Sequence, residues 1–203
     1  NEVFSYQWVS NKDFFHTHLS LRGLDSISQT KQIAPLFSVK LEAPVRLGPF
    51  IVTNHRNNSK ELIVQDENNQ LYLIDHRGKL LWKKQLDAPI QKFIHQVDLY
   101  RNKRLQFAFT TENQFMVLDR NGKEVNSLIK TFKAGGLPPL PFFDYDKSRQ
   151  YRMVFSQGTT LYMLNNKGSN VSGFNYSKLE APLAEVPKHF RLNNKDFLVF
   201  ILS

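Results

Sequence analysis

Apolar and polar residues alternate along most of the chain in short stretches that predict β-strands. The stretch LQFAFTTENQFMVLDRNGK (105–123) contains two alternating segments, separated by a polar break and closed by Asp-x-x-Gly. Period-two alternation bounded by Asn, Gly and Lys turns is the signature of strands joined in hairpins. No ten-residue window shows a convincing helical period. The sequence therefore predicts an all-β fold.

The pattern recurs at a fixed interval. Residues 61–79 and 151–169 align with 105–123 without a gap, at offsets of 44 and 46 residues, and a further copy begins at 196–203. A second marker, Leu-Glu/Asp-Ala-Pro, has the same period, with FKAGG in one of its slots. Its alanines are Ala43, Ala88, Ala134 and Ala181. Two independent markers at one period indicate a structural repeat.

Each repeat is expected to form four antiparallel strands. Around the second copy the strands are expected at 93–98, 105–111, 114–119 and 124–132. Four strands every ~45 residues is the unit of a β-propeller blade, which must stack on its neighbours to bury its faces. The predicted fold is a partial β-propeller with about four blades. The expected segments are N-terminal strands at 1–35, which match the repeat poorly and could form a partial blade, blades at about 42–87, 88–133 and 134–180, and a partial blade at 181–203.

Three arrangements of these blades remain open. The chain could be part of a longer propeller, since it opens at Asn1 rather than methionine and is interpreted as a processed or trimmed piece. The N-terminal strands could instead complete the last blade in a small ring, or the blades could form an open or oligomer-completed arc. In each case we expect the apolar strand FLVFILS (197–203) to be covered, because an unpaired edge promotes aggregation.

The strand pair LYLIDHRGKLLWKKQL (71–86) resembles the repeat of quinoprotein-like (PQQ-type) β-propellers. In that repeat a strand ending in Asp turns through a Gly-containing loop into a strand whose Trp docks between blades. The stretches VTNHRNNSKELIVQDENNQLYLIDHRGKLLW, QVDLYRNKRLQFAF, DYDKSRQYR and KHFRLNNKDFLVF resemble the propeller part of an uncharacterised family of bacterial envelope proteins. The resemblance covers about residues 36–203. It implies a propeller fold and a periplasmic or cell-envelope location, and it carries no established activity.

Asp75 could be a functional carboxylate or part of a turn. Its counterparts in the other repeats, with their glycines, are Asp119 with Gly122 and Asn165 with Gly168. A catalytic carboxylate is not needed once per blade and is not replaceable by Asn, whereas a tight turn favours an Asx residue followed by glycine. Asp75 and Gly78 are therefore predicted to close a hairpin. The positions equivalent to Trp82 in the other two repeats are occupied by Asn126 and Ser172. Trp82 is therefore predicted to be a packing residue that is specific to one blade interface.

Composition narrows the possible chemistry. The 203 residues are 41% hydrophobic and 22% charged, an ordinary globular balance, and 17 Phe and 7 Tyr favour β-structure. The absence of cysteine excludes disulfides, thiolate metal sites and a cysteine nucleophile. No apolar run approaches the ~18–20 residues that span a bilayer, so no transmembrane segment is expected in this chain.

Catalysis and cofactors are not expected. Quinone-dependent dehydrogenases of similar repeat use a carboxylate base, calcium ligands and a large ring of blades, and some use adjacent cysteines. This chain has no cysteine, about half the blades such a ring needs, and no carboxylate pair outside the repeat. His16 and His18 could begin a metal site. No third ligand is identifiable, which favours an ordinary strand pair.

Six polar residues near the ends of the predicted innermost strands are candidate ligand contacts at a channel mouth: Asn54, His55, His95, Asp98, Asp144 and His189. The alternative, which we favour, is that they cap Asx-rich hairpins such as VDLYRNK and DYDKSRQ. Three sequons, at Asn57, Asn170 and Asn175, indicate polar loops unless the protein is glycosylated. The connector KAGGLPPLP (133–141) departs from the repeat and is a candidate contact surface, although a simple connector is favoured.

Charge is unevenly distributed between two sets of turns. The first-set turns join strands one to two and three to four: 54–61, 75–79, 98–105, 119–124, 144–152, 165–168 and 191–196. They hold 15 basic and 8 acidic residues, a net charge of +7. The second-set turns are the remaining turns and connectors: 41–45, 66–70, 86–90, 111–114, 132–141, 156–160 and 179–183. They hold six acids and one lysine, a net charge of −5. The predicted particle is polarised, unless these charges serve only solubility and edge protection.

Two functions follow from these observations. The first is a non-enzymatic interaction or scaffold module that binds a protein or an anionic envelope partner, such as a membrane surface, lipid headgroup or acidic glycan. Its candidate basic contacts are Arg101, Lys103, Arg104, Lys147, Arg149 and Arg152. The alternative is a carbohydrate-binding or carbohydrate-active propeller that uses the channel-mouth residues. Nucleic acid is disfavoured, because the basic turns lack interleaved aromatic residues that could stack on bases.

Overall fold

The structure is a computed structural model that describes residues 2–11, 14–23, 36–125, 130–132, 137, 139, 141–145 and 147–203, with the backbone alone for 2–23 and for residue 130. The described residues form strands and turns, with no helix, which confirms the all-β prediction. The chain divides into two compact units, Asn1–Leu36 and Phe37–Ser203. In the first unit, β1 (Glu2–Asn11) pairs antiparallel with β2 (Phe14–Gly23).

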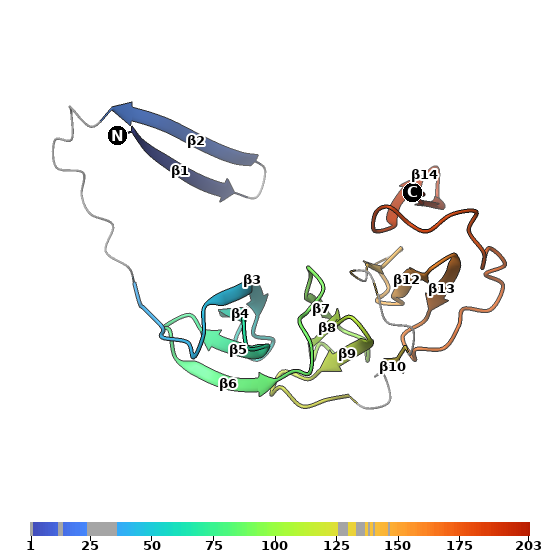
Figure 1. Ribbon diagram of the computed structural model, residues 1–203, viewed down its shortest axis with the longest axis horizontal. Helices are drawn as coiled ribbons and strands as arrows, with labels where there is room; N and C mark the ends of the chain where they lie inside the picture. Colours follow the sequence, from blue (N-terminus) through green and yellow to red (C-terminus); the bar gives the residue numbers. More distant parts are fainter. Residues whose placement is uncertain are drawn as a thin grey trace. The chain divides into compact units, whose positions relative to one another are not determined.

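The second unit contains four antiparallel sheets, whose strands follow one another in chain order (Figure 1). Sheet one contains β3 (Val45–Thr53), β4 (Lys60–Asp66), β5 (Gln70–Asp75) and β6 (Leu80–Gln85). Sheet two contains β7 (His95–Val97), β8 (Gln106–Thr110), β9 (Gln114–Leu118) and β10 (Lys130–Thr131). Sheet three contains β11 (Phe142–Phe143), β12 (Arg152–Gln157) and β13 (Thr160–Leu164), and sheet four contains β14 (Lys188–Leu192) and β15 (Lys195–Val199).

The repeated segments of the sequence form equivalent hairpins. Residues 61–79, 105–123 and 151–169 supply the second and third strands of sheets one, two and three. The fourth strand is less regular. In sheet two, Glu124 bridges to Leu118 and β10 pairs with β9, while 126–129 lie outside the described residues. In sheet three, a bridge between Leu164 and Asn170 stands in its place.

Sheet two is apolar on both faces because each face packs against a different neighbour. On β8, Phe107 and Phe109 join a core with Ile63 and Leu73 of sheet one. Ala108, which lies between them, joins a second core with Phe155 of sheet three. Successive strand residues point to opposite faces, so an uninterrupted apolar strand indicates two covered faces.

The last strands are covered on one side only. Phe200 and Leu202 pack against sheet three, as does Leu198. Phe197, at 40% exposed, stacks instead on Phe190, with ring centroids 5.1 Å apart. The expectation that FLVFILS is covered therefore holds for alternate residues in this chain. The hairpin itself is closed by Asn193 and Asn194, both at positive φ, as the favoured two-residue turn requires.

The Asx-Gly turns adopt one geometry in all three repeats. Asp75 Oδ1 accepts hydrogen bonds from the amides of Arg77 (2.8 Å) and Lys79 (2.9 Å). Asp119 and Asn165 make the same two bonds two and four residues ahead. The glycines have φ of +84°, +79° and +71° in chain order. Because asparagine replaces aspartate without loss of the turn, the predicted structural role of Asp75 is confirmed.

Replacing Asp75 by Asn should preserve this turn and reduce its acid sensitivity. Hydrogen bonds from the Lys79 and Arg77 amides hold the pKa of Asp75 below its usual value. The charged form therefore stabilises the fold above the unfolded-state pKa, and this contribution is lost as pH falls through the lower folded-state pKa. We expect the unmodified chain to melt above Asp75→Asn at about pH 6, with the gap shrinking towards about pH 3. Melting curves measure this gap, and a gap that is constant with pH would contradict the assignment.

Two aromatic residues from neighbouring segments pack against the glycines of these turns. The ring of Trp82, on β6, lies against Gly122 in the turn after β9, where an added Cβ would lie 3.0 Å from ring carbon Cδ2. The Trp82 Nε1–H also donates to the carbonyl of Arg120 (2.8 Å). Phe37 lies in the same way against Gly78, where an added Cβ would meet ring carbon Cδ2 at 2.7 Å. Trp82 is thus an interface residue, as predicted, but Phe37, 45 residues earlier, shares its role.

Candidate functional site

The candidate channel-mouth residues Asn54, Asp98 and Asp144 each cap the first hairpin of a sheet. Asn54 Oδ1 accepts from the Arg56 amide at 3.0 Å. Asp98 accepts from the Asn102 and Lys103 amides at 3.0 and 2.9 Å. Asp144 accepts from the Arg149 amide at 2.9 Å. Each of the three side chains thus accepts at least one backbone amide of its own turn, which is the role that the Asx-rich hairpins favoured.

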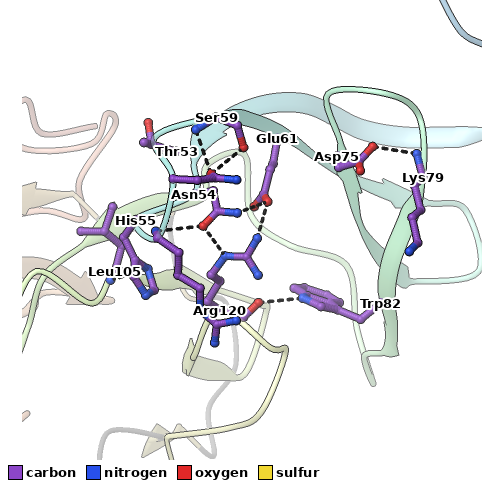
Figure 2. Close-up of polar contacts among 12 residues, drawn as sticks. Thr53, Asn54, His55, Ser59, Glu61, Asp75, Lys79, Trp82, Leu105 and Arg120 are labelled. Carbon is purple, nitrogen blue, oxygen red and sulfur yellow. Dashed lines mark hydrogen bonds and ion pairs between the residues drawn. The ribbon is translucent and has the colours of Figure 1, made fainter.

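A buried polar network joins sheet one to sheet two. Figure 2 shows Arg120 reaching from the turn after β9 towards Asn54 and Glu61 of sheet one. Its Nε–H donates to Asn54 Oδ1 (3.0 Å), and Nη2 forms an ion pair with Glu61 Oε1. Asn54 Nδ2 donates to the same Glu61 oxygen (2.9 Å). Glu61 is only 2% exposed, so the guanidinium compensates a carboxylate that is removed from water.

A related contact joins sheet two to sheet three. Asn166 follows Asn165 in the turn after β13, as Arg120 follows Asp119, and its Nδ2 donates to the carbonyls of Leu99 (3.0 Å) and Arg149 (2.8 Å). Arg149 Nη1 also donates to Asp98 Oδ2 (2.9 Å). At both interfaces, the side chain of the residue that follows the turn's Asp or Asn therefore hydrogen-bonds to the first hairpin of the preceding sheet.

Hydrogen bonds connect some of the turns within each of the two predicted sets. First-set turns of neighbouring sheets contact one another through the Arg120 and Asn166 side chains. In the second set, Glu67 N–H donates to the Pro44 carbonyl (2.9 Å), and Ile90 N–H donates to Oε1 of Gln65 on β4 (2.9 Å). That the basic residues of the first set gather on one face stays a prediction.

The three candidate histidines lie in different surroundings. His55 accepts from the Leu105 amide at Nδ1 (3.2 Å). The His95 ring packs 5.1 Å from Phe142. His189 pairs with Asp196 (3.0 Å) and lies 4.5 Å from the Tyr145 ring. His55 and Asp98 line one cavity of about 450 Å³ with Lys103 and Arg149, whereas His95, Asp144 and His189 are not among the residues that line it.

The candidate basic residues remain largely accessible. Arg101, Lys103, Arg104 and Lys147 are exposed, while Arg149 and Arg152 are half-buried. Arg149 is the only one of the six with an ion pair to a carboxylate among the residues that the structure describes. Arg101, Lys103, Lys147 and Arg149 have positive φ. Their role in binding stays a prediction.

A second cavity, of about 630 Å³, lies between the first hairpins of sheets one and two and the turn after β9. Its lining includes His55, Arg56, Tyr100, Asn102, Arg104 and Asn121. Burial, followed by the charges of Arg120, Arg56 and Arg104, lowers the pKa of His55 from its usual value. Sequence reasoning did not single out Arg56, Tyr100 and Asn121. The only available signal was their place in first-set turns, because their proximity depends on how two sheets stack.

Several other candidates give limited information. No group of metal-ligating side chains is found within the described part of the chain, and His16 and His18 lie on β2, where the backbone alone is described. The sequon residues Asn57, Asn170 and Asn175 are exposed. Of the connector 133–141, residues 133–136, 138 and 140 lie outside the description, while the amide of buried Leu137 donates to the Glu112 carbonyl (2.9 Å). Across the ranges described, no helix is long and apolar enough to span a membrane.

Comparison of the chain with known protein families and with curated proteins finds no match.

Proposed function

We propose that the chain is a non-enzymatic, β-propeller-type interaction module of the cell envelope that binds an anionic partner through its first-set turns. The supporting observation is that those turns contain two kinds of polar residue, one that caps the backbone and one that is exposed. Asn54, Asp98 and Asp144 are engaged as caps, whereas Arg101 and Lys147 project exposed charges. Among described residues, no carboxylate forms an ion pair with either of these two cations.

The repeat supports the propeller part of the proposal. Sheets one and two have the four-stranded meander of a blade, and cores alternate between one neighbour and the next. The turns at one end of stacked blades form a continuous surface, so small contributions from several exposed cations add on one side. The geometry thus favours an extended anionic partner over a small neutral one.

A triple variant tests the binding surface. Arg101, Lys103 and Lys147 have φ between 55° and 64°, a region that asparagine tolerates well, so replacing all three by Asn neutralises charge without straining the turns. At about 1 kcal/mol per cation near an anionic surface, we expect roughly a hundredfold weaker binding to anionic vesicles, or earlier elution from heparin. Binding to vesicles but not to heparin would indicate a lipid partner, and the reverse result would indicate a glycan.

The matched control replaces Lys40, Lys92 and Lys178 by Asn, which removes the same charge from exposed sites outside the first-set turns. The control should bind like the unmodified chain. Equal losses in both triple variants would show that only net charge matters, and this outcome would contradict a specific basic surface.

A second candidate function, carbohydrate binding, is favoured by one observation: His55 and Asp98 share a cavity of about 450 Å³, which is within the size range of ligand sites. Asp98 is already bonded to two backbone amides and to Arg149. A sugar at this point would therefore be recognised mainly by His55, Lys103 and the neighbouring turn atoms.

A further inference from the structure

The cavity of about 630 Å³ between sheets one and two, here named the Arg56–Arg104 pocket, carries a surplus of positive charge. Arg56 and Arg104 are both exposed and line it. Within the described chain, neither forms an ion pair with a carboxylate. Asp119 also lines the pocket, but its Oδ1 accepts two backbone amides, and Glu61 compensates Arg120. Three guanidinium groups (Arg56, Arg104 and Arg120) against two carboxylates (Asp119 and Glu61) leave a net charge of +1, and among these described residues Arg56 and Arg104 are the two cations without an ion pair.

The remaining polar groups are mostly hydrogen-bond donors. His55 accepts the Leu105 amide at Nδ1, which places its proton on Nε2 and makes that atom a donor. Burial, followed by the charges of Arg120, Arg56 and Arg104, lowers the pKa of His55 and so favours this neutral form. Asn102 Oδ1 accepts the Arg104 amide (3.0 Å), which leaves the side-chain NH₂ for a ligand. Such a lining suits a ligand rich in acceptor oxygens.

The apolar part of the pocket is small. Tyr100 is 54% exposed and contributes one ring, and Leu105 and Val125 are the aliphatic side chains among the described residues that line the pocket. A nucleobase is normally held by aromatic stacking, of which one exposed ring supplies little. One flat ring beside amides and guanidinium groups instead matches a hydroxylated ring with a carboxylate, since the guanidinium fork pairs with carboxylates in a bidentate manner.

We propose that the Arg56–Arg104 pocket binds an acidic saccharide, with the arginines on a uronic acid carboxylate, Asn102 and Asn121 on hydroxyl groups, and the Tyr100 ring against the sugar face. This inference rests on the proposed function, since it assigns a substrate class to the same basic turns. The volume of the pocket is within the range of about 300–1,000 Å³ that is typical of small-ligand sites.

Titration calorimetry of the full chain with trigalacturonic acid tests the assignment. We expect binding that weakens by about tenfold or more in Arg56→Gln, because a charge-assisted bidentate contact is lost, and by a similar factor in Tyr100→Ala. The matched controls are Arg46→Gln and Tyr176→Ala, which alter an exposed arginine and an exposed tyrosine outside both the pocket lining and the first-set turns. Both controls should bind like the unmodified chain.

Three outcomes would overturn the assignment: no binding, binding that Arg56→Gln and Tyr100→Ala leave unchanged, or Arg56-dependent binding of inorganic phosphate with no binding of the uronate. Failure of the pocket is distinguishable from failure of the proposed function. If Arg101, Lys103 and Lys147 still control heparin retention while the pocket variants bind normally, the basic surface stands and the pocket assignment falls.

Discussion

Replacing Arg120 by methionine is expected to destabilise the fold by about 3–5 kcal/mol, because the Glu61 carboxylate would be left buried without a compensating charge. Glu61 is 2% exposed, and its Oε2 already lacks a hydrogen-bond partner within the described structure. Methionine keeps much of the packing volume of the arginine stem, so the loss is mainly electrostatic. Urea denaturation measures the change, with an unchanged dependence on urea as the check that the unfolded state is not altered.

The double variant Glu61→Gln with Arg120→Met isolates this cause. Glutamine removes the buried charge and still accepts the hydrogen bond from Asn54 Nδ2, which joins Glu61 Oε1 at 2.9 Å. We expect the double variant to be more stable than Arg120→Met alone, with a coupling free energy in the range of about 0.5–3 kcal/mol that is typical of contacting residues. A double variant as unstable as the sum of both single variants would contradict the network.

Replacing Gly78 by alanine is expected to cost more than replacing Gly173 by alanine, although the two glycines have nearly equal φ of +84° and +81°. Both substitutions carry the left-handed backbone penalty of about 1–2 kcal/mol. An added Cβ at Gly78 would meet the Phe37 ring at 2.7 Å, whereas nothing lies within 4 Å at Gly173. Overpacking adds about 1–3 kcal/mol at Gly78.

The difference in unfolding free energy between the two glycine variants measures the contribution of the aromatic packing alone, and thermal or urea unfolding gives this difference. Adding Phe37→Ala to Gly78→Ala should recover part of the lost stability, since it removes the overlap between the new Cβ and the ring. Equal destabilisation of Gly78→Ala and Gly173→Ala would show that Phe37 does not hold this turn, and would remove the evidence that an aromatic residue recurs at this position.

The sequence was sufficient for the parts of the fold that depend on local pattern. The Asx-Gly turns at Asp75, Asp119 and Asn165 were predictable because a side-chain cap and a glycine at positive φ are encoded within five residues. Short strands were harder: β7 begins at His95, although the apolar pattern predicted a strand from residue 93. A pattern specifies which residues are buried, but the length of a strand depends on its partner.

Contacts between sheets were predictable only in part. Trp82 was identified as an interface residue, yet Phe37 was not, because it precedes the first marker of the repeat and shares only the aromatic character of its counterpart. Arg56 and Arg104 are 48 residues apart in sequence, and their shared pocket depends on the stacking of two sheets. Side chains that act across an interface leave no spacing signal within one repeat, so the site could not be derived from periodicity.

The central claim, that the basic first-set turns bind an anionic partner, is tested most directly by the salt dependence of binding. Calorimetric titration of the full chain with heparin at increasing sodium chloride measures it, because screening by salt weakens contacts between exposed charges. We predict an affinity that falls steadily with salt, and a shallower fall for the chain with Arg101, Lys103 and Lys147 replaced by Asn. Absence of binding at low salt, or an equal salt dependence in both proteins, would contradict the claim.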